Sequence, residues 1–112
     1  MFDRIGASLE NYMTVLSVRQ RIVASNIANA DTPGYRTKDV DFQSAFQDAA
    51  DGILPRTQDV EGLKIKNDGN NVNLDREARL LSETDIRFSV ASQLVRSELK
   101  TIRSAIDEGR NG

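Results

Sequence analysis

Hydrophobic residues recur every three or four positions at both ends of the chain, and the middle lacks this pattern. One such row covers residues 3–30 and another covers residues 74–107, so the sequence predicts a long amphipathic helix at each end. At 1.5 Å per residue these helices would be roughly 42 Å and 50 Å long. The expected fold is mainly α, with two long terminal helices that pair as a coiled-coil-like hairpin. Residues 1–112 are expected to form a single domain.

The row on the first predicted helix is apolar at seven of its nine positions. Its members are Phe2, Ile5, Leu9, Tyr12, Leu16, Arg19, Val23, Asn26 and Ala30. We predict that Ile5, Leu9, Leu16 and Val23 form a helix interface. The polar members Arg19 and Asn26 have two interpretations: they set register or partner choice, or they lie exposed at the edge of the row.

The second predicted helix begins after Asn73, with acidic residues in its first turn, where anions suit the helix dipole. Its row is Leu74, Ala78, Leu81, Asp85, Phe88, Ser92, Val95, Leu99, Ile102 and Ile106, apolar at eight of ten positions. The predicted interface residues are Leu81, Phe88, Val95, Leu99 and Ile102, and we expect Ile86, Val90 and Leu94 to widen the same face. Gly109 is expected to end this helix.

The segment between the helices, residues 31–73, is polar and contains turn signals such as Asp51-Gly52 and Pro55. Residues 40–46 are compatible with a short strand or a helical turn, and residues 60–65 with a short strand or hairpin. We expect at most short strands here. Because the segment is too polar for a core of its own, it should lie on the helices or stay mobile.

The composition weighs against several classes of function. Lys and Arg total 15 against 17 Asp and Glu, a near-balance that disfavours nucleic-acid binding. His and Cys are absent, which removes the commonest general base, soft metal ligands and a thiol nucleophile. We therefore expect no enzyme activity, no small-molecule substrate and no cofactor. No basic-then-apolar secretory leader is recognised either.

Two groups of oxygen-bearing side chains have a simpler explanation than chemistry. The acid pairs Asp39 with Asp41 and Asp48 with Asp51 show no sign of the burial that separates the pKa values of catalytic carboxylates. They are expected to be solvated loop acids. Residues 68–73 carry oxygens at alternate positions, but the glycine and glutamate spacing of a calcium loop is missing. Turn formation explains this stretch better, and no metal site is expected.

The end of the first predicted helix carries a particular motif. Residues 25–42 read Ser-Asn-Ile-Ala-Asn-Ala-Asp-Thr-Pro-Gly-Tyr-Arg-Thr-Lys-Asp-Val-Asp-Phe. This stretch resembles the signature that closes the N-terminal helix of flagellar rod, hook and hook-associated proteins. The matching residues are Asn26, Asn29, Thr32, Pro33, Gly34 and Tyr35. The run over residues 39–42 and the later run over residues 68–77 narrow the resemblance to the proximal-rod members. The segment over residues 46–68 is short and leaves no room for the separate outer domain of the larger rod and hook proteins.

The resemblance implies a structural subunit of the flagellar basal-body rod, the axial drive shaft that crosses the periplasm and serves motility. It implies contacts with other rod proteins and with the MS-ring and export-gate adaptor region, and self-association in the assembled rod. It also implies passage through the flagellar type III export channel without a cleaved signal peptide. A rival from another class is a soluble helical adaptor or export chaperone that binds partner helices, although this leaves the Thr-Pro-Gly-Tyr motif unexplained.

The motif also has a physical interpretation. Asn26 and Asn29 are expected to satisfy carbonyls left open at the helix end. Gly34 is expected at positive φ, in the third position of a type II turn. The motif is either a local cap alone or a cap that also fixes a loop for contact with neighbouring subunits. Tyr35 favours the second alternative, because it supplies a flat ring with a polar tip.

Overall fold

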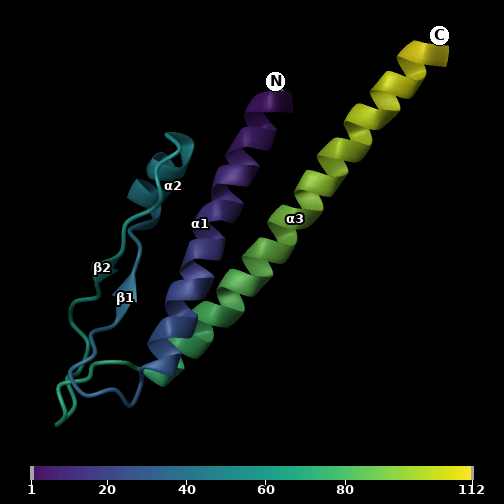
Figure 1. Cartoon of the computed structure of the whole chain (residues 1–112). Coiled ribbons are helices and arrows are strands. Elements are labelled where there is room, and N and C mark those ends of the chain that lie inside the picture. Colours follow the sequence, from purple (N-terminus) through teal and green to yellow (C-terminus); the bar gives the residue numbers. More distant parts are fainter. Residues whose placement is uncertain (1, 112) are drawn as a thin grey trace.

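The computed structural model describes residues 2–111 and consists of two long helices, one short helix and one small sheet. In chain order the elements are α1 (Phe2–Ala28), β1 (Lys38–Asp39), α2 (Phe42–Ala50), β2 (Gln58–Asp59) and α3 (Leu74–Asn111). The two terminal helices run in opposite directions and contact each other (Figure 1). The molecule is elongated, at 71 × 25 × 18 Å. The predicted mainly helical fold with long terminal helices is confirmed.

The first helix ends close to where the sequence predicts, and a tight turn follows it. α1 ends at Ala28 rather than residue 30. The Tyr35 amide donates to the Thr32 carbonyl at 3.2 Å, and Gly34 has a φ of 75°. Because Pro33 and Gly34 occupy the two central positions, this is the predicted type II turn.

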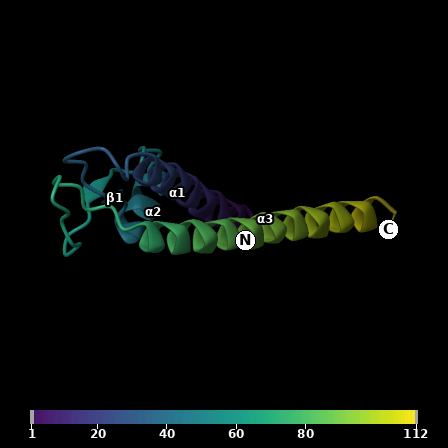
Figure 2. The same cartoon turned by 90° about the horizontal axis from the view of Figure 1, so that it is seen from below.

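The last helix is longer than predicted. It begins at Leu74, where the Asn73 side chain accepts a bond from the Arg76 amide at 3.1 Å and so caps the first turn. The prediction that Gly109 ends the helix is wrong, because α3 continues to Asn111. A glycine in a helix costs about 1 kcal/mol relative to alanine but blocks neither the backbone nor its hydrogen bonds. Figure 2 shows α3 extending well beyond the start of α1.

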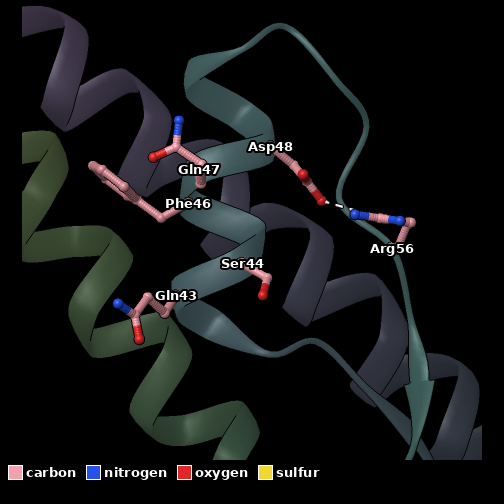
Figure 3. Close-up of a pocket in the computed structure, with 6 residues that line it drawn as sticks. All are labelled: Gln43, Ser44, Phe46, Gln47, Asp48 and Arg56. Carbon is pink, nitrogen blue, oxygen red and sulfur yellow. Dashed lines mark ion pairs between the residues drawn. The ribbon is translucent and has the colours of Figure 1, made fainter.

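The middle segment contains a helix, which is one of the two structures predicted for residues 40–46. Apolar residues at Phe42, Ala45, Phe46 and Ala49 have helical spacing, and α2 turns them toward α1. The expectation of at most short strands is therefore wrong for residues 42–50. After α2 the chain doubles back, and Asp48 lies 3.7 Å from Arg56 of the returning segment (Figure 3).

The small sheet forms earlier in the chain than predicted. β1 pairs antiparallel with β2, with Lys38 opposite Asp59 and Asp39 opposite Gln58. The prediction of a strand or hairpin over residues 60–65 is wrong, since the pairing lies at residues 58–59 and is followed by irregular structure. The bonds of β1 to α1 and α3 set its position, and β2 forms where the returning chain pairs with β1.

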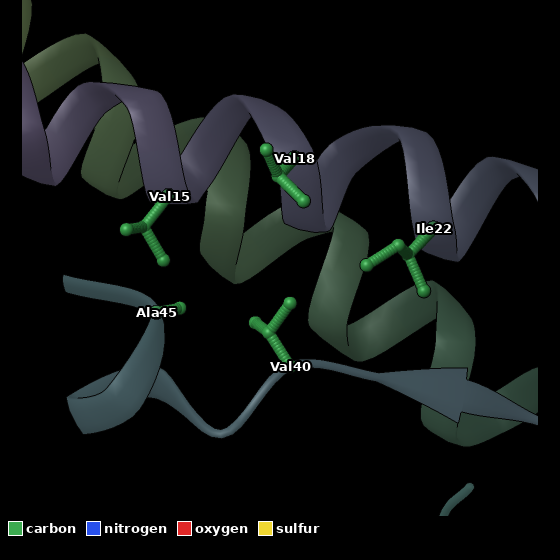
Figure 4. Packing of buried hydrophobic residues seen from close by; sticks show 5 residues of the cluster. All are labelled: Val15, Val18, Ile22, Val40 and Ala45. Atoms are coloured by element: carbon green, nitrogen blue, oxygen red, sulfur yellow. The ribbon is translucent and has the colours of Figure 1, made fainter. Parts of the chain in front are cut away.

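The hydrophobic core lies between α1 and the middle segment (Figure 4). It consists of Val15, Val18 and Ile22 from α1 together with Val40 and Ala45. The middle segment therefore lies on a helix, which is one of the two expected outcomes. Nearby, the Tyr12 and Phe42 rings meet edge to face with their centroids 5.7 Å apart.

A second buried face of α1 is turned toward α3. Gln20 and Asn26 bond to Asp85 and Glu77 of α3, and Leu16 and Val23 lie between them around the helix. Both of these apolar side chains are almost completely buried. Because α1 contacts α2 and β1 on one side and α3 on another, it is the central element of the molecule.

The buried face of α3 differs from the predicted row. Leu74 and Ala78 are exposed, whereas Glu77, Thr84 and Ala91, seven residues apart, are buried. Further along, Leu81, Phe88, Val95 and Ile102 are partly buried, in line with the row. The expectation that Ile86, Val90 and Leu94 widen this face is wrong, because all three are more than half exposed. Within residues 2–111, no helix combines the length and hydrophobicity needed to cross a membrane.

Candidate functional site

Asn26, near the end of α1, is fully buried and joins three elements. Its amide nitrogen donates to the Lys38 carbonyl at 2.8 Å and to the Glu77 carboxylate at 3.2 Å. Its amide oxygen accepts from the Lys38 amide at 3.1 Å and from the Tyr35 hydroxyl at 3.0 Å. The prediction that Asn26 caps carbonyls of its own helix is wrong, because its side chain is turned toward α3 and β1.

An ion-pair network lies next to Asn26. Asp39 accepts two bonds from Arg19, at 3.2 and 3.0 Å, and one from Arg76 at 3.2 Å. Arg76 also donates to the fully buried Glu77 at 2.7 Å. The expectation of a solvated acid is wrong for Asp39, and also for Asp48, since both are buried. The fork of Arg19 matches a carboxylate in two parallel bonds, so it fixes orientation as well as charge.

The stretch over residues 68–73 closes over the turn that follows α1. The buried Asn70 donates to the carbonyls of Asn29 and Thr32, at 2.8 Å each. The Asn71 side chain accepts from the Thr37 amide at 2.7 Å and from its hydroxyl at 2.9 Å. These contacts hold the turn after α1 and the chain at Thr37 against residues 70 and 71, and they add to the backbone bonds that the Asn29 and Thr32 carbonyls already accept. They support turn formation as the role of this stretch.

The rest of the motif forms the tip of the same turn. The Asn29 side chain donates to the Ser25 carbonyl at 2.9 Å, so it contacts the last turn of α1 as predicted, although that carbonyl also accepts the Asn29 backbone amide. Pro33 and Gly34 are exposed, and the Gly34 amide donates to the Asp68 carbonyl at 2.9 Å. The Tyr35 hydroxyl points inward to Asn26, whereas the residue as a whole stays partly exposed.

We use the name clamp for the polar network at this end of the molecule. Its members are Asn26, Tyr35, Asp39, Asn70, Arg76 and Glu77. Among the described residues, no buried side-chain nitrogen or oxygen lacks a hydrogen-bond partner. The clamp is thus a fully satisfied polar network, which rigidifies the region and specifies one arrangement of the chain.

The opposite end of the hairpin is apolar and incompletely covered. We call residues 4–12 of α1 and 95–106 of α3 the open end. A groove of about 320 Å³ runs between the two helices there, lined by Gly6, Ala7, Glu10, Val95, Glu98, Leu99 and Ile102. Ile5, Leu99 and Ile106 are each about half exposed. Exposed apolar stripes of this kind mark interaction surfaces.

The predicted interface residues are therefore divided between the two ends. Leu16 and Val23 are buried within the chain. Leu9, Leu81, Phe88, Val95 and Ile102 are partly buried, and Ile5 and Leu99 are exposed. Midway along the hairpin, Arg87 donates to the Tyr12 hydroxyl at 3.4 Å and to Glu83 at 3.0 Å. The bonds to Tyr12 and Glu83 raise the pKa of the Arg87 guanidinium.

One hollow of the surface lies beside α2 and offers little for catalysis. It has a volume of about 610 Å³ and is lined by Gln43, Ser44, Phe46, Gln47, Asp48 and Arg56 (Figure 3). The Ser44 hydroxyl donates to Asp41 at 2.8 Å, a bond at the start of α2. Asp48 is held beside Arg56. These contacts stabilise the end of a helix and a returning loop.

Comparison with known proteins points to the same segments. The family model described as "Flagella basal body rod protein" matches residues 13–36, which contain Asn26 and the whole Thr-Pro-Gly-Tyr turn. The chain is also similar over nearly its full length to proteins named "Flagellar basal body rod protein FlgB". The Salmonella typhimurium protein is 29% identical, with 97% of this chain and 99% of the relative covered. The Bacillus subtilis protein is 22% identical, with 98% of each covered.

These matches confirm the resemblance to flagellar basal-body rod proteins, and they extend it over nearly the whole chain. The family match ends just after the turn, at residue 36. The other clamp residues, Asp39, Asn70, Arg76 and Glu77, lie outside it. The sequence indicates residues 68–77 only as part of the family resemblance. It does not predict the contacts of Asn70, Arg76 and Glu77. The available signal was a glutamate at helical spacing within an otherwise apolar face, directly after a run of asparagines.

Proposed function

We propose that this chain is a structural subunit of the proximal part of the flagellar rod. Its full-length similarity to proteins named as basal body rod proteins carries this conclusion. The coarser statement, a structural subunit of the flagellar basal-body rod, follows directly from that similarity and the family match. The role is mechanical rather than catalytic: the chain supplies helices to an axial structure.

The geometry supports different roles in assembly for the two ends of the hairpin. The clamp fixes the register of α1 against α3, because Asn26 of α1 reaches Glu77 of α3 only when the helices are correctly aligned. Arg19 of α1 and Arg76 of α3 also meet on Asp39 in this alignment. The open end then presents Ile5, Leu99 and Ile102 in a fixed arrangement. In this proposal neighbouring helices complete the open end in a coiled-coil-like layer. The whole chain, residues 1–112, acts as one rod-protein domain.

The proposed partners are other rod proteins, further copies of this chain and the MS-ring and export-gate adaptor region. The proposed route is the flagellar type III export channel, without a cleaved signal peptide. One observation suits such a route. The helices are amphipathic, and isolated helices of this kind are only marginally stable before they pack. The tip of the turn over residues 31–34 is exposed and is proposed as a contact loop.

Location in purified basal bodies tests the function. We expect an epitope-tagged chain to co-purify with detergent-extracted basal bodies and to be absent from fractions of a strain without them. A chain that stays in the cytoplasmic fraction, bound to one client protein, would support the adaptor or chaperone alternative. A strain lacking the gene should be non-motile, and the tagged copy should restore swimming.

Amide hydrogen exchange on the dilute protein is a second way to distinguish a rod subunit from an adaptor. We expect weak protection in the open end, residues 4–12 and 95–106, because few apolar contacts hold these turns. Residues 14–28 should be better protected, since they carry the core and the clamp. Uniformly strong protection along both helices would mean that the hairpin needs no neighbour, which favours the adaptor. The comparison between the two halves of α1 serves as the internal control.

A further inference from the structure

One side of the hairpin carries four exposed charges in two matching pairs. α1 bears Glu10 and Arg21, and α3 bears Asp85 and Arg96. The spacing is eleven residues on each helix, which is close to three turns, so both members of a pair share one side of their helix. None of the four forms an ion pair among residues 4–110, whose side chains the structure describes. We call the surface that bears these four residues the charged face.

The two charges nearest the open end lie at nearly the same height along the hairpin. The Glu98 carboxylate of α3 lies beside Gly6 of α1. Counted from this contact toward the clamp, Glu10 is four residues along α1 and Arg96 is two residues along α3. At 1.5 Å per residue their heights differ by about 3 Å. The groove of the open end separates them, with Glu10 on one wall and Arg96 one turn from Leu99 on the other.

The other two charges meet the same condition nearer the clamp. Gln20 of α1 donates to Asp85 of α3, so these residues are level. Arg21 follows Gln20 directly, so Arg21 and Asp85 also lie at nearly the same height. Each helix therefore presents one anion and one cation, and at each height the two helices carry opposite charges.

A second copy, related by a two-fold axis parallel to the helices, matches this pattern. The rotation keeps every height and sets α1 of each copy opposite α3 of the other. Glu10 then faces Arg96 of the second copy, and Arg21 faces its Asp85. Because the interface is isologous, the symmetry makes each of these ion pairs twice.

The apolar groove distinguishes this parallel pairing from an antiparallel one. An end-over-end rotation would also join opposite charges, Glu10 to Arg21 and Asp85 to Arg96 of the second copy. It would, however, set the open end of one copy opposite residues nearer the clamp of the other. The parallel arrangement instead brings the two open-end grooves together, so Leu99, which is 59% exposed, is covered by apolar atoms.

The neighbouring charges at the open end support the match. Lys100 and Arg103 follow Arg96 after about one and two turns, so they add positive charge to the same part of α3. Glu98 adds negative charge within the groove that Glu10 borders. In the parallel pairing the cations of one copy lie near the two carboxylates of the other, which is favourable.

The ion pair closest to Asp85 in the sequence lies on a different side of α3. Glu83 and Arg87 stand two residues from Asp85 in either direction, which is about 200° around the helix. On that side Arg87 donates to the Tyr12 hydroxyl at 3.4 Å, and the Tyr12 ring meets Phe42 of α2. This ion pair therefore does not lie on the charged face.

We infer that two copies of this chain pair in parallel through the charged face. The inference goes beyond the proposed function and does not require it, since it concerns the chain in solution. The face covers ~20 Å of two helices that are each ~10 Å wide, or roughly 400 Å², against the ~800 Å² per partner of a stable interface. The dimer is therefore weak and forms at high protein concentration. It also covers the groove of the open end, so pairing and rod assembly compete for one surface.

Sedimentation equilibrium of the purified full chain tests the pairing. We expect a concentration-dependent equilibrium between monomer and dimer at low ionic strength. Arg96→Glu and Glu10→Arg should each weaken association at least about tenfold, because each change sets like charges opposite one another twice. Arg4→Glu is the matched control: it makes the same charge change at the same end of the hairpin, but Arg4 lines a different groove, beside Phe46 of α2. This control should leave association unchanged.

Exchange of the two charges within one chain identifies the arrangement. A chain with both Glu10→Arg and Arg96→Glu should recover association, because the parallel pairing then makes the same ion pair with its charges exchanged. The antiparallel pairing would instead set like charges against Arg21 and Asp85, so the doubly substituted chain would stay monomeric. That result would overturn the inference.

Two other outcomes would also overturn it. One is a chain that remains monomeric at every concentration, and the other is an equal loss of association for Arg4→Glu and Arg96→Glu. Circular dichroism should be the same for all variants, since every substituted side chain is exposed. A monomeric chain that is still recovered in basal bodies rejects the dimer and leaves the rod function intact.

Discussion

The two ends of the hairpin use opposite means of recognition. At the clamp, Asn26, Asn70 and Glu77 are buried and polar, and their hydrogen bonds are all made within the chain. At the open end, Leu99 and Ile106 are apolar and exposed. A polar network has one satisfied arrangement, so it specifies register, whereas an apolar stripe accepts partners with fewer geometric demands. In the proposed assembly the clamp therefore defines the monomer, and the open end is available to neighbouring helices.

This difference predicts the largest contrast between two substitutions of the same kind. Leu16→Asp places a carboxylate at a position that is 0% exposed, and it should destabilise the chain by about 4 kcal/mol or more. Leu99→Asp changes a side chain that is 59% exposed and should alter the free energy of unfolding by about 0.5 kcal/mol or less. Urea denaturation measures both values.

Both aspartate variants should nevertheless fail to enter basal bodies, for different reasons. Leu16→Asp is too unstable to assemble, whereas Leu99→Asp stays stable but lacks its interface. Lys64→Gln is the silent control, because the Lys64 side chain is exposed and belongs to neither the clamp nor the open end. Normal motility of the Leu99→Asp strain would remove the open end from the assembly surface. Full stability of Leu16→Asp would mean that the α1–α3 contact is not essential to the monomer.

The clamp is tested by removing one of two glutamates that pair with arginine on the same helix. Glu77→Ala removes one of the two acceptors of the buried Asn26 amide nitrogen and one of the two carboxylates that bond to Arg76, and should cost about 3 kcal/mol. Glu83→Ala breaks an exposed pair with Arg87 and should cost less than about 1 kcal/mol. Thermal unfolding of the two variants side by side gives the comparison. Equal losses would show that the clamp adds no more than a surface ion pair.

Sequence reasoning succeeded where a single local rule decides the structure. Apolar spacing gave both long helices, and Pro33 with Gly34 gave the type II turn, because backbone restrictions act within a few residues. Asn73 also begins the last helix as expected. The helix over residues 42–50 stayed undecided, since its apolar pattern is short and two structures suit it equally.

Sequence reasoning failed where residues distant in the chain decide the outcome. Asp39 looked like a solvated acid because its partners, Arg19 and Arg76, are 20 and 37 positions away. Ile86, Val90 and Leu94 looked like part of the buried face, because hydrophobicity alone does not say which side of a helix meets its partner. The buried Glu77 fixes that side, and its role becomes visible only with Asn26 in place.

Tyr35 links the clamp to the proposed contact loop, and two substitutions separate these roles. Tyr35→Phe removes the hydroxyl that bonds to Asn26 and should cost about 1 kcal/mol. Because the ring remains, we expect this variant to enter basal bodies. Tyr35→Ala also removes the partly exposed ring; it should retain its helix content by circular dichroism but fail to incorporate. If Tyr35→Ala incorporates at the normal level, the ring has no contact role and the residue serves the clamp alone.

The smallest expected effect concerns two glycines with nearly the same backbone conformation but different locations. Gly34 and Gly52 have φ values of 75° and 73°, and a Cβ at either position would meet no atom within 4 Å. Gly34→Val and Gly52→Val should therefore lose similar stability, about 1 kcal/mol or more, because a β-branched residue is strained at positive φ. Gly52 follows α2, away from the motif, whereas Gly34 lies at the exposed tip of the turn. At low temperature, where both variants stay folded, only Gly34→Val should be recovered poorly in basal bodies. Equal recovery would leave the turn as a helix cap without a part in assembly.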